Sequence, residues 1–92
     1  MVAYRAFINQ TFTFTITGTT TGSIWGTNIY TDDSDLATAA VHSGFVLFNE
    51  TKVVVVQVLS GLSNYNGSTQ NGVTSFTFFS WLGSFIFISA SG

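Results

Sequence analysis

Cysteine and proline are both absent from the 92-residue sequence, and charged residues make up only 7% of it. Without cysteine there is no disulfide, no thiol nucleophile and no thiolate metal site. Only two basic residues, Arg5 and Lys52, stand against four acidic ones. Because nucleic-acid binding needs a basic surface, this composition predicts no nucleic-acid partner.

Long hydrophobic runs are also missing, since no segment approaches the ~18 apolar residues of a membrane span. Residues 1–10, MVAYRAFINQ, lack the apolar core and cleavage site of a signal peptide. Apolar residues nevertheless make up 46% of the chain and aromatic residues 16%. A small domain with so few charges and so much apolar surface is expected to use part of it for contacts with other molecules.

Several segments have the patterns of β-strands. TFTFTIT, residues 11–17, alternates between threonine and large apolar residues, which predicts a strand with one solvated face. SIWGTNIYT, residues 23–31, predicts a strand in which Gly26 marks a bulge or a close backbone approach. KVVVVQVL, residues 52–59, has the four consecutive valines typical of a strand covered on both faces.

Only DDSDLATAAVHSG, residues 32–44, has a helical pattern. Asp33 or Ser34 is the expected N-cap, and Gly44 supplies the left-handed stop. His42 falls in the last turn, as a partner of the helix dipole or a buried hydrogen-bonding strut. We therefore predict an α+β, mostly β fold, with about six mainly antiparallel strands wrapped around one short central helix.

The same segment contains three of the four acidic residues and the only histidine, so it is the first candidate for chemistry. Its oxygen ligands would suit Ca²⁺, but the spacing, glycine and late glutamate of a calcium loop are missing. His42 with a serine and an aspartate could form a hydrolase triad, but no nucleophile elbow is present. Helix capping explains these residues more simply, so we predict no catalytic, cofactor or metal site and no enzyme activity.

Four aromatic residues, Trp25, Tyr30, Tyr65 and Trp81, could stack against a sugar ring, although most aromatic side chains of a small β-rich domain belong to its core. Tyr65 is the best placed, because its neighbours in SGLSNYNGSTQNG are turn residues. We therefore treat Tyr65, Asn66 and Asn71 as a candidate ligand loop.

The helical segment together with its preceding strand, YTDDSDLATAAVHSG, resembles the signature of the LCCL domain family. GSIWGTNIYT, YNGSTQNGVTS and WLGSF resemble three further family segments, so the similarity covers about residues 11–87. It implies a β-rich fold around a central helix, no enzymatic activity, and binding of lipopolysaccharide or other surface ligands, or adhesion to a matrix.

The resemblance also gives framework roles to residues of the helical segment. These are Tyr30, Asp33, Ser34, Ala39, Ala40, His42 and Gly44. Where the eukaryotic pattern has a cysteine after Leu36, this sequence has Ala37, so it is more similar to cysteine-free microbial relatives. Its stability must then come from packing or from contacts with neighbouring molecules.

Residues 1–10 lie outside this resemblance, as an N-terminal arm attached to a single domain at residues 11–92. One strand from Val2 to Thr17 would reach ~50 Å, whereas a 92-residue globule is roughly 30 Å across. The arm must therefore bend sharply or project. A projecting arm could be donated to a neighbour's sheet, through Tyr4, Ala6, Phe7 and Ile8.

Taken together, these features predict a structural subunit without catalytic activity, self-associating through β-strand and apolar contacts into an extracellular or cell-surface filament or array. The alternative is a monomeric adhesion module that recognises a glycan or lipopolysaccharide through the candidate ligand loop. Sequons at Asn9, Asn49 and Asn66 could carry N-glycans, but asparagine, serine and threonine are frequent enough to produce sequons by chance.

Overall fold

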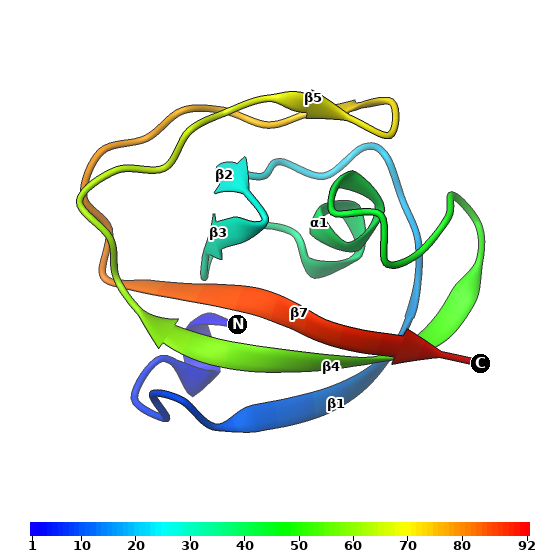
Figure 1. The fold of residues 1–92 in the computed structure, drawn as a ribbon, viewed down its shortest axis with the longest axis horizontal. Coiled ribbons are helices and arrows are strands. Elements are labelled where there is room, and N and C mark those ends of the chain that lie inside the picture. Colours follow the sequence, from blue (N-terminus) through cyan, green and yellow to red (C-terminus); the bar gives the residue numbers. More distant parts are fainter.

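A five-stranded antiparallel sheet and one short helix dominate the computed structural model, which describes residues 1–92 (Figure 1). The sheet order is β1-β4-β7-β3-β2, and β5 and β6 form a separate two-stranded sheet. The prediction of a mostly β fold with one helix is confirmed. The elements are η1 (Val2–Tyr4), β1 (Thr11–Thr17), β2 (Gly26–Thr27), β3 (Ile29–Thr31), α1 (Leu36–His42), β4 (Thr51–Ser60), β5 (Thr69–Gln70), β6 (Val73–Thr74) and β7 (Gly83–Ser91).

Strand β1 forms one edge of the sheet and follows its sequence pattern. Its threonines are exposed, whereas Phe12, Phe14 and Ile16 are partly buried on the inner side. The strand pairs with β4 without a register shift along its whole length. Alternation alone therefore determined which side of β1 faces the core.

The valines of β4 depart from the prediction of a strand covered on both faces. Val54, Val56 and Val58 are buried against the interior, but Val53 is 37% exposed and Val55 is only partly buried. The reason is that β4 lies between β1 and β7 in an antiparallel sheet, with the helix on one face only (Figure 1). The outward valines lie beside the exposed threonines of β1.

Helix α1 begins later than the sequence suggested. Asp35 is the N-cap, its carboxylate accepting a 3.0 Å hydrogen bond from the Thr38 amide, so the expectation that Asp33 or Ser34 caps the helix is wrong. Ser34 instead belongs to the preceding turn, where its amide donates to the Thr31 carbonyl. Gly44, with φ of +87°, supplies the predicted left-handed residue after the helix.

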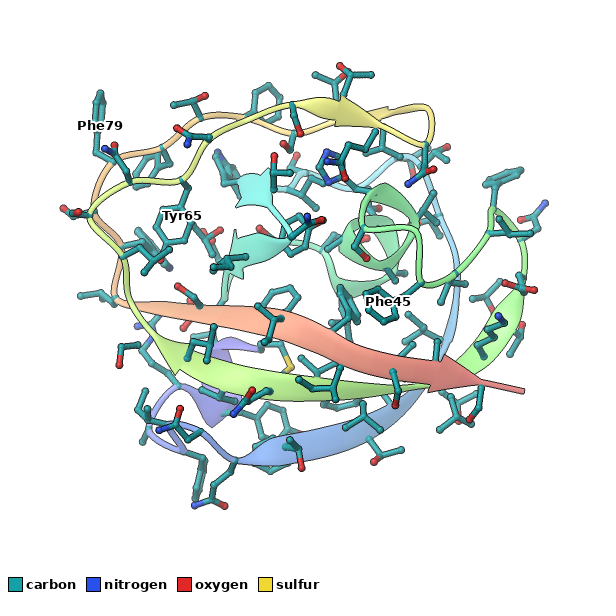
Figure 2. All side chains as sticks on the ribbon, viewed as in Figure 1. Phe45, Tyr65 and Phe79 are labelled. Atoms are coloured by element: carbon teal, nitrogen blue, oxygen red, sulfur yellow. The ribbon has the colours of Figure 1, made fainter.

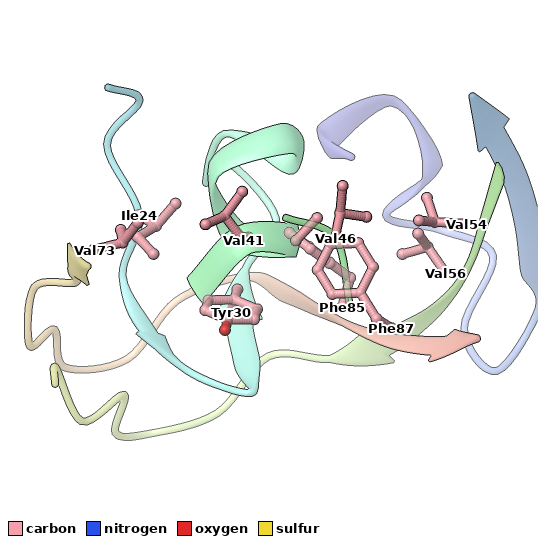
Figure 3. Packing of buried hydrophobic residues seen from close by; sticks show 11 residues of the cluster. Ile24, Tyr30, Val41, Val46, Val54, Val56, Val73, Phe85 and Phe87 are labelled. Atoms are coloured by element: carbon pink, nitrogen blue, oxygen red, sulfur yellow. The ribbon is translucent and has the colours of Figure 1, made fainter. Parts of the chain in front are cut away.

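The core lies between α1 and the inner face of the sheet (Figure 3). Ala39 and Ala40 are fully buried, and such small side chains let the helix backbone lie close to the aromatic rings beneath it. Those rings are Tyr30, Phe85 and Phe87, whose centroids lie 5.7 to 6.3 Å apart. Every buried side-chain nitrogen and oxygen has a hydrogen-bond partner, so burial of polar groups is compensated throughout.

The N-terminal arm bends sharply, which is one of the two forms expected for it, and it contains no strand. Val2–Tyr4 form the 3-10 helix η1, and the Tyr4 ring packs 4.5 Å from that of Phe12. The Asn9 amide then donates to the Val58 carbonyl, which leads the chain into β1. The arm therefore folds back over its own sheet (Figure 1).

Gly26 occupies the close backbone approach that its place in a strand predicted. It has φ of +106° and pairs with Tyr30 across the β2–β3 hairpin. A Cβ at this position would collide with the Ile29 carbonyl oxygen. Both the dihedral angle and the space therefore require glycine.

Gly26→Ala is expected to lower the free energy of unfolding by about 3 kcal/mol, the upper end of the cost of local backbone strain. Gly72→Ala is the matched control, because Gly72 also has positive φ (+77°) but a Cβ there would meet nothing within 4 Å; it should cost ~1 kcal/mol. Urea denaturation of both variants measures the difference. Equal losses would show that the close approach contributes nothing.

Candidate functional site

The three aspartates of residues 32–35 do not form a common site. Asp32 is 1% exposed and binds Arg5 and Trp81, whereas Asp35 caps the helix. Asp33 is exposed and makes no hydrogen bond or ion pair. No group of three or more potential metal ligands converges anywhere in the structure.

Asp32 is the centre of a buried polar network that joins distant parts of the chain. Arg5 donates two hydrogen bonds to its carboxylate, from Nε at 2.6 Å and Nη2 at 2.8 Å, and Trp81 Nε1 donates a third at 2.8 Å. Burial alone would raise the pKa of Asp32, but the hydrogen bonds from Arg5 and Trp81 and the charge of Arg5 outweigh it and lower that pKa. The ion pair fixes the arm to the turn before the helix.

His42 is fully buried and uses both ring nitrogens inside the fold. Nδ1 lies 2.8 Å from the Tyr30 hydroxyl and Nε2 lies 3.0 Å from the Ser68 carbonyl oxygen. Because a carbonyl oxygen only accepts, Nε2 carries the proton and Nδ1 accepts from Tyr30. Burial raises the pKa of Tyr30 to about 12, so its hydroxyl remains the donor. This arrangement connects β3, α1 and the segment before β5, and leaves no ring nitrogen for a substrate.

Tyr65 does not form a surface for a sugar. It is 2% exposed, and Figure 2 shows its ring pointing inward. Its hydroxyl accepts from the Leu62 amide and is hydrogen-bonded to Ser84. Two main-chain hydrogen bonds with Phe78 hold it there. Its turn-rich neighbours gave no sign of this long-range pairing.

The other residues of the candidate ligand loop are divided between structure and solvent. Asn71 Nδ2 donates to the His42 carbonyl oxygen at 2.9 Å and so satisfies the C-terminal end of α1. Asn66 is exposed, as are the other sequon asparagines, Asn9 and Asn49. Asn66 adjoins an open groove of about 440 Å³ that Thr27, Asn64 and Ser68 also line.

Two tryptophans that the sequence assigned to the core in preference to a stacking surface line a cleft. Trp25, Phe78 and Trp81 form its aromatic walls, and Thr31 and Asp33 complete a space of about 80 Å³. Trp25 precedes β2, whereas Phe78 and Trp81 lie in the segment between β6 and β7. The sequence offered both tryptophans as stacking candidates, but it could not show that they meet.

The four most exposed large apolar side chains lie near the two ends of the long axis. Leu47 and Phe48, in the segment between α1 and β4, are 67% and 59% exposed. Phe79 and Leu82, between β6 and β7, are 76% and 70% exposed. Figure 1 places these segments at opposite ends of the molecule, and Figure 2 shows Phe79 projecting away from it.

The residues of the predicted assembly arm differ in exposure. Tyr4 is partly buried against Phe12 and Phe14, whereas Ala6, Phe7 and Ile8 are exposed. No strand is offered for exchange in this conformation, so the surface available for contact is that of the last three residues.

The LCCL domain model matches residues 3–85, which shows that the chain belongs to the LCCL domain family. The match includes residues 3–10, most of the N-terminal arm. Arg5 is therefore within the matched region, in agreement with its ion pair to Asp32.

Human Vitrin is 40% identical over 67 residues, which is 73% of this chain and 10% of Vitrin. Mouse Vitrin is 41% identical over 63 residues. The transcriptional regulatory protein rxt3 of Schizosaccharomyces pombe is 43% identical over 56 residues, 56% of this chain and 16% of that protein. The chain thus spans between a tenth and a sixth of these relatives, and the domain occurs in proteins of different kinds. No helix here is long and apolar enough to cross a membrane.

Replacing Arg5 should show how strongly the arm is fixed. Arg5→Met leaves Asp32 as a buried carboxylate without its counter-ion, which is costlier than removing both charges. We expect a lower thermal midpoint for Arg5→Met than for the double variant Arg5→Met/Asp32→Asn, measured by circular dichroism at pH 7. Equal midpoints would mean that the charges are not coupled.

Acid should weaken the fold through the same carboxylate. The pKa of Asp32 is lower in the folded than in the unfolded chain, where it is ~3.9. Its contribution is therefore fully present above about pH 5 and is lost as the pH falls through the folded-state pKa. Urea denaturation from pH 7 to pH 2 should show a shallower loss of stability for Asp32→Asn than for the unaltered chain. Parallel curves would contradict this assignment.

Proposed function

We propose that this chain is a structural domain without catalytic activity that self-associates head to tail into an extracellular filament or surface array. The supporting observation is the pair of exposed apolar ends, Leu47 with Phe48 and Phe79 with Leu82. Two different surfaces at opposite ends give a heterologous contact, which extends into a filament when it does not close into a ring.

The scarcity of charge favours the same function. The chain has a net charge of −2, and four of its six charged side chains form two ion pairs, Arg5 with Asp32 and Lys52 with Glu50. Little like-charge repulsion therefore opposes contact between copies. The apolar ends would gain free energy by leaving water.

The free edge of β1 offers a second, lateral contact. β1 ends the sheet, has no proline or charged residue, and pairs only with β4. Edge strands that lack such protection pair readily with other strands. Thr13→Lys/Thr15→Lys places two charges there and should reduce lateral association without affecting the head-to-tail contact.

A mixing experiment tests the head-to-tail arrangement. In chains that also carry Thr13→Lys/Thr15→Lys, which removes the lateral contact, Leu47→Ser/Phe48→Ser removes one end and Phe79→Ser/Leu82→Ser removes the other. Each variant alone should be monomeric by light scattering, with association weakened ~10-fold or more, because central apolar contacts carry most of an interface's energy. An equimolar mixture should form dimers and nothing longer, since only one complementary pair of ends remains.

Two results would overturn this arrangement. An unaltered chain that stays monomeric at every concentration would remove self-association altogether. If either end variant formed dimers on its own, the remaining apolar end would be pairing with the same end of a second copy. Deleting residues 1–10 is not an informative test, because it also removes the counter-ion of Asp32.

The alternative, recognition of a glycan, is supported by the polar groove beside Asn66. Thr27 donates to the Asn66 carbonyl and is hydrogen-bonded to Ser68, which fixes these three lining residues relative to one another. A glycan array should then show a saturable ligand whose binding Asn66→Ala abolishes. A glycan bound equally by Asn66→Ala would place recognition elsewhere.

A further inference from the structure

A small cleft with aromatic walls contains the one carboxylate that the fold does not use. Trp25, Phe78 and Trp81 line it together with Thr31 and Asp33, around a space of about 80 Å³. No other cleft of the molecule brings two tryptophans together. A volume of this size accommodates roughly three water molecules, or one small alkyl or ammonium group.

Asp33 is the one acidic side chain without a partner in the fold, so its carboxylate is available to a ligand. Asp32 binds Arg5, Asp35 accepts from the Thr38 amide, and Glu50 accepts from the Leu47 amide. Asp33 is exposed and unbonded. The family resemblance implied a framework role for Asp33, but its side chain makes no hydrogen bond or ion pair within the fold. Its negative charge is therefore free to act at the cleft.

The walls of the cleft are held by bonds that do not involve a ligand. Trp81 is fixed by its hydrogen bond to Asp32, and the Phe78 ring packs edge-on to it at a centroid distance of 5.7 Å. The Trp25 amide donates to Ser34 Oγ at 3.0 Å, and its carbonyl accepts from the Thr31 amide. Binding therefore needs little ordering of the Trp81 and Phe78 side chains, which lowers its entropic cost.

Aromatic faces attract cations through their negative quadrupole, most strongly in tryptophan. Trp81 already does so, since the Arg5 guanidinium carbon lies 5.8 Å from its ring centroid. That charge is neutralised by Asp32. The interactions open to a further ligand are therefore the cleft's aromatic surface and the charge of Asp33.

We propose that this cleft binds a small quaternary ammonium group such as that of free choline. A methylated cation suits it better than a primary ammonium, because the walls are apolar and offer few acceptors to replace lost water. A phosphate attached to the same head group would find no free basic side chain, and the Met1 ammonium already interacts electrostatically with Asp32 and Asp33. Arg5 is engaged with Asp32, and Lys52 lies at the other end of the sheet, beside Glu50. The ligand is therefore a free solute, not a phospholipid head group.

This function goes beyond self-association and can be tested without it. Trp81 of the cleft also lines a neighbouring hollow with Leu82, so a neighbour in an assembly could cover the cleft. Leu47→Ser/Phe48→Ser keeps the cleft and removes the opposite apolar end. All titrations use this variant, at a concentration where light scattering shows monomers, so a failure of the assembly proposal leaves the result interpretable.

The experiment compares choline chloride with 3,3-dimethyl-1-butanol, which has the same shape without the charge, at constant ionic strength. Tryptophan fluorescence and the indole N–H signals in NMR spectra report on the cleft. Choline should bind saturably with a dissociation constant on the order of 1 mM, and the neutral analogue at least ~5-fold more weakly. Asp33→Asn and Phe78→Leu should each weaken choline binding ~3-fold or more, and neither removes a hydrogen bond of the fold.

Four outcomes would overturn the proposal. Equal affinity for the neutral analogue would make the cleft merely apolar. Absence of saturable choline binding, or binding unchanged by both substitutions, would show that the cleft is not a cation site. Flotation with phosphatidylcholine vesicles, in the absence of binding to free choline, would assign the surface to a membrane instead.

Discussion

Burial of the Asp32 carboxylate constrains this domain more than any other single contact. An ion removed from water needs compensation by an opposite charge and by hydrogen bonds, and Arg5 is the cation that supplies it here. The arm must therefore return to the turn that precedes α1. Trp81 supplies the third hydrogen bond, which also draws the segment before β7 to the same turn. The aromatic cleft exists because these segments meet at Asp32.

Features set by a few neighbouring residues were predictable from the sequence. The alternation of TFTFTIT gave the faces of β1, and the positions of Gly26 and Gly44 gave a close approach and a helix end. Asp35, not Ser34, caps α1 because Ser34 is engaged with Trp25 across the turn. A capping rule that considers only neighbouring residues cannot take account of a partner nine residues away.

The remaining differences also come from contacts between distant residues. Tyr65 is buried because it pairs with Phe78, and its turn-rich neighbours indicate only a loop. The valines of β4 suggested two covered faces, but which layers cover a strand depends on sheet order. The cleft combines residues from positions 25 to 81. Each of its residues has an ordinary alternative role, so their meeting could not be inferred from any one segment.

Hydrogen bonds between neutral hydroxyl groups connect segments that ion pairs connect in more highly charged domains. Thr17 is hydrogen-bonded to Thr51, Thr19 to Thr38, and Thr69 to Thr74. Such bonds are hardly screened by salt. The fold is thus expected to respond weakly to ionic strength, while its outer surface keeps few charges to separate one copy from another.

The place of β7 in the sheet has a consequence for how the domain forms. This strand is the last in the sequence, yet it lies between β4 and β3 and pairs with both. Until residues 83–91 are available, β1 with β4 and β2 with β3 are two unconnected ladders, and the apolar edge of β4 is open. During synthesis the sheet can therefore close only after its final strand has left the ribosome. A chain ended before that point would expose the valine-rich edge most prone to mispairing.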